Sequence, residues 1–493
     1  MLKILLILLA FANIQTAETG TNRGAYLITP DSNNLEYRQG YGFGYSGNGW
    51  DDEKTAYLST QAGYDGQRKK FPENHFAIWG YGIELDDVQT NTKLGILDIV
   101  GYLANPTPGH SSNASNLPQF CYPANLYEPI WLEDGSVNPN NYWAAYVNKT
   151  VGIYKDYVKI WEVWNEPDYT KNYGAVSDWA TNPPKPKDLV YWYGTIFEYI
   201  RLQRISYEVA KKIDPNCWVA TGGLGYPEFL DAIMRYTDNP DGGKVTDEYP
   251  AYGGAYFDCD TYHQYPQYGT TDIETGEEYN DIGSDMLAKK VVILKKSHHF
   301  ITKKYGFGAK YPDKIFINTE TGYTSDNTEQ SELVRRNWII KMALYQIEYD
   351  VKQIHQLTLT GDFSNVGKYV SIEEGAKHIK SSSKARVLLK KMNLGKYVFV
   401  SDKTASFRKS LPEGLTGIVL KRKFPKVTGE AYYYKYLYSV WVNCLKEEVA
   451  GEVKVNLSLP FDPLVLDWQE NKKQMTKSDI FTVTNTPIFL LGN

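Results

Sequence analysis

Cysteine, basic charge and long apolar runs are all scarce in this chain, and each shortage excludes a class of protein. Four cysteines among 493 residues, with no Cys-x-x-Cys pair or Cys/His cluster, exclude a disulfide scaffold and a zinc module. A net charge of −5 gives no basic surface for nucleic acid. Beyond the N-terminus, no run approaches the ~20 apolar residues of a membrane span. The sequence also lacks repeats, glycine-rich phosphate loops and a nucleophile elbow.

The N-terminal segment MLKILLILLAFANIQTAETG is arranged as a secretory signal peptide, with one lysine, an apolar run and then small and polar residues. We expect residues 1–17 to be removed near Ala17, and the protein to be secreted or lumenal, in an extracellular, lysosome-like or cell-wall setting. Three N-glycosylation sequons, at Asn113, Asn148 and Asn456, agree with that route. The sequence therefore predicts a secreted glycoprotein.

Cys217 and Cys259 each begin an apolar strand-like run, CWVATGGL and CDTYHQY. If these strands are neighbours, the two thiols lie at the same end and could bridge, although in-register parallel neighbours offer an awkward geometry for the bond. A disulfide between them and two free buried thiols are both consistent with the sequence. The state of Cys121 and Cys444 is left open by the sequence as well.

Between residues 40 and 394, short apolar strand-like runs alternate with longer amphipathic stretches. Alternation of this kind indicates parallel strands joined by right-handed crossovers, and eight strands favour a closed (β/α)8 TIM barrel over an open sheet. Helices are expected over 142–156, 188–213, 285–304, 331–348 and 373–393. The expected strands are 40–46, 66–71, 95–103, 158–164, 217–223, 258–265, 314–320 and 351–359.

Beyond Gly395 the pattern changes to short strand-like runs joined by turns, with no helix expected between them. Runs such as GLTGIVLKRKF and YYYKYLYSVWVNC predict an antiparallel β-sandwich over residues 395–493. Segment 24–38, ahead of the barrel, is a candidate for one further strand of that sandwich. No long linker separates the two units, so we expect them to pack rigidly.

Polar side chains stand where four of the predicted barrel strands end. In EVWNEPDY the fourth strand ends in Asn165 and Glu166, and the seventh strand ends in Glu320. A packed strand gains nothing from a carboxylate at its tip, whereas the active-site groups of (β/α)8 barrels sit at strand ends. Two glutamates facing each other across the barrel mouth suit hydrolysis of a glycosidic bond, in which an acid protonates the leaving oxygen and a carboxylate traps the sugar. The other strand-end residues are His263 and Tyr265 on the sixth strand and Arg68 on the second.

WNEP at the fourth strand and NTETG at the seventh resemble the motifs of glycoside hydrolase clan A, whose members are retaining (β/α)8 enzymes. The C-terminal sandwich and the sixth-strand motif TYHQY (261–265) are most similar to family 39, the β-xylosidases and iduronidases, with family 5 second. The resemblance covers the order of elements from about 40 to 493, and its specific part lies in these short motifs. The sequence departs from the clan A pattern in two places: the eighth strand lacks the usual tryptophan, and the first strand lacks a histidine. Both departures bear on which sugar is bound rather than on the type of reaction.

The resemblance assigns supporting roles to three of these residues. Tyr265 matches the residue that hydrogen-bonds the nucleophile, and His263 matches a residue that lines the sugar site. Arg68 matches a basic residue that helps to fix the nucleophile. Taken by themselves, His263 also fits a structural strand-end histidine, and Arg68, within GQRKKF, fits a solvated basic patch.

The same resemblance implies that Glu166 is the acid/base, Asn165 the amide that holds the sugar 2-hydroxyl, and Glu320 the nucleophile. The expected function is that of a secreted retaining β-glycosidase, which hydrolyses O-glycosidic bonds by double displacement and requires no metal or cofactor. Its substrate would be a β-linked oligosaccharide, polysaccharide or glycoconjugate. The competing interpretation is a catalytically silent glycan-binding or cell-wall-associated protein on the same fold.

Overall fold

The computed structural model describes most of the chain. The predicted signal peptide (1–17), the candidate strand 24–38, Asn113 and Cys121 lie outside the described residues. The described residues are 41–46, 52–112, 122–172, 176–323, 325–326, 328–357, 362–363, 377–426, 429–448 and 451–493.

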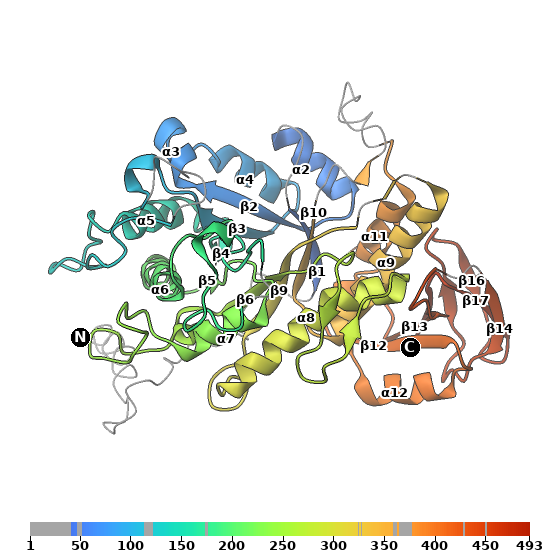
Figure 1. Cartoon of the computed structure of the whole chain (residues 1–493). Coiled ribbons are helices and arrows are strands. Elements are labelled where there is room, and N and C mark those ends of the chain that lie inside the picture. The colour runs from blue at the N-terminus through green and yellow to red at the C-terminus, as the bar shows by residue number, and fades with distance from the viewer. Residues whose placement is uncertain are drawn as a thin grey trace, which may run out of the picture.

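Eight parallel strands close into a barrel (Figure 1). The order around the barrel is β1-β10-β9-β6-β5-β4-β3-β2, so the first strand pairs with both the second and the last. Each predicted strand is present within a few residues of its expected bounds, which confirms the predicted (β/α)8 fold. The strands are β1 (Gly42–Ser46), β2 (Gly66–Pro72), β3 (Asp98–Ala104), β4 (Val158–Val163), β5 (Trp218–Ala220), β6 (Cys259–His263), β9 (Ile315–Thr321) and β10 (Gln353–Leu357), with a small hairpin of β7 (Thr270–Thr271) and β8 (Glu278–Tyr279) after β6.

Helices connect the strands and cover the outside of the barrel (Figure 1). The predicted helix 188–213 begins later, at Ile196, because Thr195 and Glu198 form a capping box there. Of the predicted helix 373–393, the part from Ser381 to Lys391 is helical, and residues 373–376 lie outside the described residues. No described helix is both long enough and apolar enough to cross a membrane. The helices are α2 (Asp52–Gln61), α3 (Glu73–Trp79), α4 (Leu85–Lys93), α5 (Tyr142–Tyr154), α6 (Ile196–Ile213), α7 (Pro227–Arg235), α8 (Ser284–Lys304), α9 (Glu329–Glu348) and α11 (Ser381–Lys391), with short 3-10 helices at Pro108–His110, Pro186–Asp188, Gly253–Tyr256 and Leu394–Lys396.

The barrel interior contains an apolar layer on which the candidate site rests. Val100, Ile160, Trp218, Cys259 and Ile317, from five strands, pack there in one buried cluster. Residues two positions apart on a strand face the same side, so the next inward positions continue toward the carboxyl ends of the strands. Those positions carry polar side chains, and they form the mouth of the barrel.

Among the described residues, Cys217 and Cys259 are buried free thiols, and Cys444 is also buried, with its Sγ 3.6 Å from the Val442 carbonyl oxygen. The strands that Cys217 and Cys259 introduce are neighbours, β5 and β6, but the two thiols do not bridge. Among the sequon asparagines, Asn148 and Asn456 are exposed.

The C-terminal residues form two antiparallel sheets with a common core, as predicted for a β-sandwich. The larger sheet has the order β11-β12-β13-β18-β15-β16, and the smaller one pairs β14 with β17. Alternate residues of β12 divide between two cores: Val419 packs between the sheets, whereas Ile418 and Leu420 pack toward the barrel. The strands are β11 (Tyr397–Phe399), β12 (Leu415–Arg422), β13 (Tyr436–Val442), β14 (Glu452–Asn456), β15 (Leu464–Leu466), β16 (Lys472–Gln474), β17 (Ile480–Thr484) and β18 (Ile488–Gly492).

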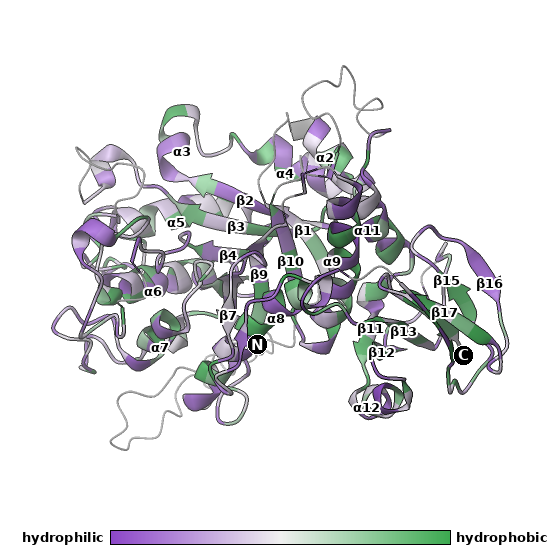
Figure 2. Cartoon of the chain, turned by 45° about the vertical axis from the view of Figure 1, so that its right-hand side comes forward, coloured by the Kyte–Doolittle hydropathy of each residue, from purple (hydrophilic) through white to green (hydrophobic). Residues whose placement is uncertain are grey.

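One prediction for this region is wrong, because a helix, α12 (Ser401–Ser410), lies between β11 and β12. Its sequence SDKTASFRKS is polar and buries only Thr404 and Phe407, so it has no apolar stripe that would identify a helix in the sequence. Strand β16 is also absent from the prediction. Its residues are all exposed, and Figure 2 shows it as hydrophilic at the outer edge of the domain.

The barrel and the sandwich share a buried core. Asp285, at the start of α8, is fully buried, and its carboxylate accepts hydrogen bonds from Trp441 Nε1 (2.7 Å) and Cys444 N (2.7 Å) of the sandwich. Lys341 of α9 balances the charge of Asp285 at 2.7 Å. Because these buried polar groups bond directly to one another, they fix the sandwich on one side of the barrel.

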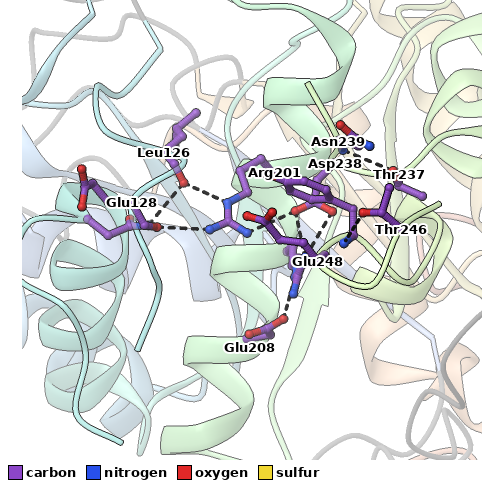
Figure 3. A network of polar contacts seen from close by, with 12 residues as sticks. Leu126, Glu128, Arg201, Glu208, Thr237, Asp238, Asn239, Thr246 and Glu248 are labelled. Carbon is purple, nitrogen blue, oxygen red and sulfur yellow. Dashed lines mark hydrogen bonds and ion pairs between the residues drawn. The ribbon is translucent and has the colours of Figure 1, made fainter. Parts of the chain in front are cut away.

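A second buried network ties two long connections to α6 (Figure 3). Asp238, which follows α7, lies 3.2 Å from Arg201 and 3.1 Å from Arg204. Arg201 also donates to the carbonyl oxygens of Leu126 and Glu128, between β3 and α5. The two arginines therefore hold both connections on the barrel wall.

Candidate active site

The predicted site residues of four strand ends meet around Arg68 of β2. Arg68 Nε lies 2.6 Å from Glu162 Oε2, Nη1 lies 3.0 Å from Glu320 Oε2, and Nη2 donates to Asn165 Oδ1 at 2.7 Å. Glu162 is fully buried and Arg68 nearly so. A planar guanidinium with this fork of bonds fixes β2, β4 and β9 relative to one another. Arg68 is therefore a buried, fully bonded side chain at the barrel mouth and not a solvated basic patch.

Glu320, at the end of β9, is held as a carboxylate. Its Oε1 accepts a hydrogen bond from the Tyr265 hydroxyl, and its Oε2 accepts the bond from Arg68. Burial alone would raise the pKa of Glu320, but the charges of His263 and Arg68 and the hydrogen bond from Tyr265 together lower it below its ordinary value. Glu320 is therefore ionised near neutral pH, the state that a nucleophile requires.

Glu166 lies against His263, its direct partner. Glu166 Oε1 is 2.8 Å from His263 Nδ1, and His263 Nε2 is 3.1 Å from Thr319 Oγ1. Burial would lower the pKa of His263, but the charge of Glu320 and the bond to Glu166 raise it overall. The ring fits because Gly223 has no side chain, since a Cβ there would lie 2.3 Å from His263 Nε2. His263 is thus more than an isolated strand-end histidine.

The backbone that presents Glu166 is strained. Trp164 has a φ of 76° and Glu166 a φ of 47°, in the left-handed region that residues other than glycine rarely adopt. Trp164 is locked by hydrogen bonds from its N to Leu103 O (2.9 Å) and from its Nε1 to Tyr191 O (2.9 Å). Glu166 N donates to Gly222 O at 2.6 Å. Strand β3, the residues after β5 and the segment around Tyr191 therefore impose the sharp turn that aims the Glu166 carboxyl.

Glu166, His263 and Glu320 each place one side-chain oxygen or nitrogen within 4.8 Å of the other two. The two glutamate side chains remain 21 % and 17 % exposed, so a ligand can reach both. Among the described residues these three groups also have the spacing of metal ligands, but Arg68 beside Glu320 would oppose a divalent cation. The arrangement suits two carboxyl groups that act on one bond placed between them.

Sequence reasoning does not find three further residues of the site. Thr319 Oγ1 donates to Glu162 Oε1 at 2.6 Å, beneath the two exposed glutamates. The Tyr102 ring lies 4.3 Å from the Arg68 guanidinium carbon, and burial raises the pKa of Tyr102 to about 12. Only Glu162 carries a signal in the sequence, because a charge within the apolar run YVKIWEV is out of place in a packed strand.

Comparisons with known proteins add information on the fold. No protein-family model matches the chain, and no curated protein matches it. Among solved structures, the chain is similar to a glycoside hydrolase family 30 subfamily 8 xylanase from Clostridium acetobutylicum, with a TM-score of 0.50 and 12 % identity over 92 % of this chain and 96 % of that chain. The chain shares the fold of that xylanase.

Two further solved structures show the same architecture. The catalytic domain of the GH30 xylanase C from Talaromyces cellulolyticus has a TM-score of 0.52 and 12 % identity, over 94 % of this chain and 99 % of that chain. A conserved exported protein from Bacteroides fragilis has a TM-score of 0.52 and 9 % identity, over 92 % and 98 %. Both xylanases belong to family 30, which agrees with a clan A fold but does not show the family 39 membership that the motifs suggest.

Proposed function

We propose that the protein is a retaining β-glycosidase in which Glu320 is the nucleophile and Glu166 the acid/base. The observation that carries this proposal is the facing carboxyl pair, since one oxygen of each glutamate lies within 4.8 Å of the other. Retaining glycosidases hold their carboxyl groups about 5–5.5 Å apart, whereas inverting enzymes leave about 6.5–9.5 Å for a water molecule. The short gap supports a covalent intermediate over direct attack by water.

In the first step, Glu320 attacks the anomeric carbon while Glu166 donates its proton to the departing glycosidic oxygen. The bond to the leaving group breaks, and a glycosyl ester forms on Glu320. Arg68 and Tyr265 keep Glu320 ionised and oriented before the attack. Asn165 accepts a hydrogen bond from Arg68 through Oδ1, which orients its amide NH2 group as the donor to the sugar 2-hydroxyl.

In the second step, Glu166 is a carboxylate and takes a proton from the water that attacks the anomeric carbon. The ester bond to Glu320 breaks, and the sugar leaves with its original anomeric configuration. His263 supports this exchange, because its Nδ1 lies 2.8 Å from Glu166 Oε1 and its raised pKa favours a protonated ring. The imidazole thus stabilises the negative charge that Glu166 acquires in the first step, and the reaction uses only side chains and water.

The proposed substrate is a β-linked oligosaccharide, polysaccharide or glycoconjugate in a secreted or lumenal setting. The setting is supported by the signal-peptide pattern of residues 1–17 and by the exposed sequon asparagines Asn148 and Asn456. Secretion places a glycosidase where polymeric glycans occur. Peptide mapping of the secreted protein, before and after removal of N-glycans, would establish the processing site and the occupancy of the sequons.

Azide rescue tests the two catalytic roles separately. On an aryl glycoside with a good leaving group, Glu166→Ala should complete the first step and then accumulate the glycosyl-enzyme, because the second step lacks its base. Azide needs no base, so it should restore turnover and give a β-glycosyl azide. Glu320→Ala should lose activity by several orders of magnitude on every substrate, and azide should then give the α-anomer. Glu452→Ala, which removes an exposed carboxylate of the sandwich, is the control.

Two outcomes would overturn the proposal. Full activity of Glu166→Ala on a glycoside with a poor leaving group would show that Glu166 is not the acid. Binding on a glycan array without hydrolysis of β-xylosides, β-glucosides or polymeric β-glycans would identify a catalytically silent glycan-binding protein instead.

A further inference from the structure

Strand β2 carries a second basic side chain into the barrel mouth. Residues two apart on a strand face the same side, so Lys70 follows Arg68 on the inner face, roughly 7 Å nearer the carboxyl ends of the strands. Lys70 Nζ lies 6.0 Å from the centre of the Tyr102 ring, the same ring that Arg68 covers. Lys69, between them, faces outward and pairs with Asp87. Lys70 therefore belongs to the site and Lys69 to the barrel wall.

Lys70 has no acidic partner within ion-pair distance among the described residues. The carboxylates that line the mouth are already bonded to Arg68 or to His263. Lys70 is only partly exposed, and burial together with the positive charge of Arg68 lowers the pKa of its amine. A partly desolvated amine of this kind is stabilised by an anion placed beside it.

We propose that Lys70 binds an anionic substituent, a carboxylate or a sulfate, on the sugar held at Glu320 or on its neighbour, so that the preferred substrate is an acidic β-linked glycan. The inference rests on the proposed function of the same site. A sugar in the mouth contacts Glu320 and Asn165, and Arg68 is bonded to both. Lys70 stands one layer above Arg68, beside the ring of that sugar. It selects the substrate without touching the bond that breaks.

The test compares acidic and neutral substrates that share one leaving group. An aryl β-glucuronide and an aryl β-glucoside differ only at C6, which is a carboxylate in the glucuronide and a hydroxymethyl group in the glucoside. The 6-O-sulfated aryl β-glucoside carries a sulfate at the same position. In the wild type, kcat/KM should be higher for one of the acidic substrates than for the neutral one. Lys70→Met should lower the selectivity ratio, which is kcat/KM for the acidic substrate divided by kcat/KM for the neutral one, about ten- to a hundredfold. This is the effect of one charge-assisted hydrogen bond. The acidic substrate whose ratio falls identifies the anion.

Two matched variants control the comparison. Lys70→Arg keeps the charge and should retain most of the selectivity ratio. Lys93→Met removes an exposed lysine from the end of α4 and should leave the ratio at the wild-type value. Because the described residues give the Lys70 amine no ion pair, Lys70→Met should melt close to the wild-type temperature, which separates lost recognition from misfolding.

The outcomes distinguish this inference from the proposed function. Cleavage of the neutral glycoside in preference to both acidic ones, with a ratio that Lys70→Met leaves unchanged, would refute the inference while the glycosidase proposal stands. If no glycoside is cleaved, the glycosidase proposal fails, and calorimetric titration with the same three glycosides decides the inference alone. Binding of an acidic glycoside that Lys70→Met weakens about tenfold would support it, and equal binding by both proteins would refute it.

Discussion

Removal of one hydroxyl group beside Glu320 should move the acid limb of the pH–activity profile. Tyr265 donates to Glu320 Oε1, and this bond helps to hold the pKa of Glu320 below its ordinary value against the opposing effect of burial. Tyr265→Phe keeps the ring and removes the bond. A hydrogen bond to a charged group contributes about 1.5–3 kcal/mol, and one pH unit corresponds to about 1.4 kcal/mol, so the pKa of Glu320 should rise by about 1–2 pH units.

The direction of the change follows from the proposed role of Glu320 as the nucleophile. A nucleophile must be ionised, so activity falls as the pH drops through the pKa of Glu320, and a higher pKa moves that fall to higher pH. The assay is kcat/KM on an aryl β-glycoside between about pH 3 and pH 9, where the wild type should be most active on the acidic side of neutral. Tyr268→Phe is the control, because Tyr268 is 66 % exposed and loses the same atom on the molecular surface. An unmoved acid limb in Tyr265→Phe would mean that Glu320 is not the group that titrates there.

Raising the pH should remove the stabilising effect of His263: its pKa is raised above 6.5 in the folded protein, so its contribution is complete below about pH 6.5 and is lost as the pH rises through the raised pKa. The difference in Tm between the wild type and His263→Asn should therefore narrow above that pKa, and a difference that stays constant from about pH 5 to pH 9 would contradict this linkage. Asp285→Asn leaves the buried Lys341 without its counter-charge and should lower the free energy of unfolding in urea by about 3–5 kcal/mol, whereas a loss below about 1 kcal/mol would show that this buried pair contributes little to stability. Mass spectrometry of unreduced peptides should recover Cys217 and Cys259 as separate thiols, and a peptide pair joined through them would contradict the structure.

The barrel could be predicted from the sequence because most of its strands are apolar runs that end at turn residues. β4 (Val158–Val163) is such a run, and its burial on both faces of the sheet is what a parallel strand requires. Helix α12 could not be predicted in the same way, because it is held in place largely by Phe407 against the sandwich. Its conformation is set by tertiary contact rather than by its own pattern.

The facing pair of glutamates could be predicted because a carboxylate at a strand end is unfavourable in a packed strand. GQRKKF is different, since three consecutive basic residues do not reveal which of them faces inward. Which of these residues faces inward depends on the register of β2 against β1 and β3. That register turns the side chains of Arg68 and Lys70 into the mouth of the barrel and that of Lys69 away from it. The contact between His263 and Glu166 likewise depends on left-handed backbone at Glu166 and Gly223, which no local pattern indicates.

Closure of the barrel by its first strand has a consequence for synthesis of the chain. One large buried core of the described residues runs from Phe71 to Phe307, whereas another joins Phe43 of β1 to Leu491 of β18. At about 5–20 residues per second, a ribosome takes roughly 20–90 s to supply the residues between those two positions. Until β10 (Gln353–Leu357) is made, the edge of β1 that pairs with it is open, and an open strand edge is a template for pairing with other chains. Strand β1 must therefore be shielded until β10 has emerged. Because the core that contains Phe43 also includes Leu491, a chain truncated within the sandwich would leave that strand incompletely buried.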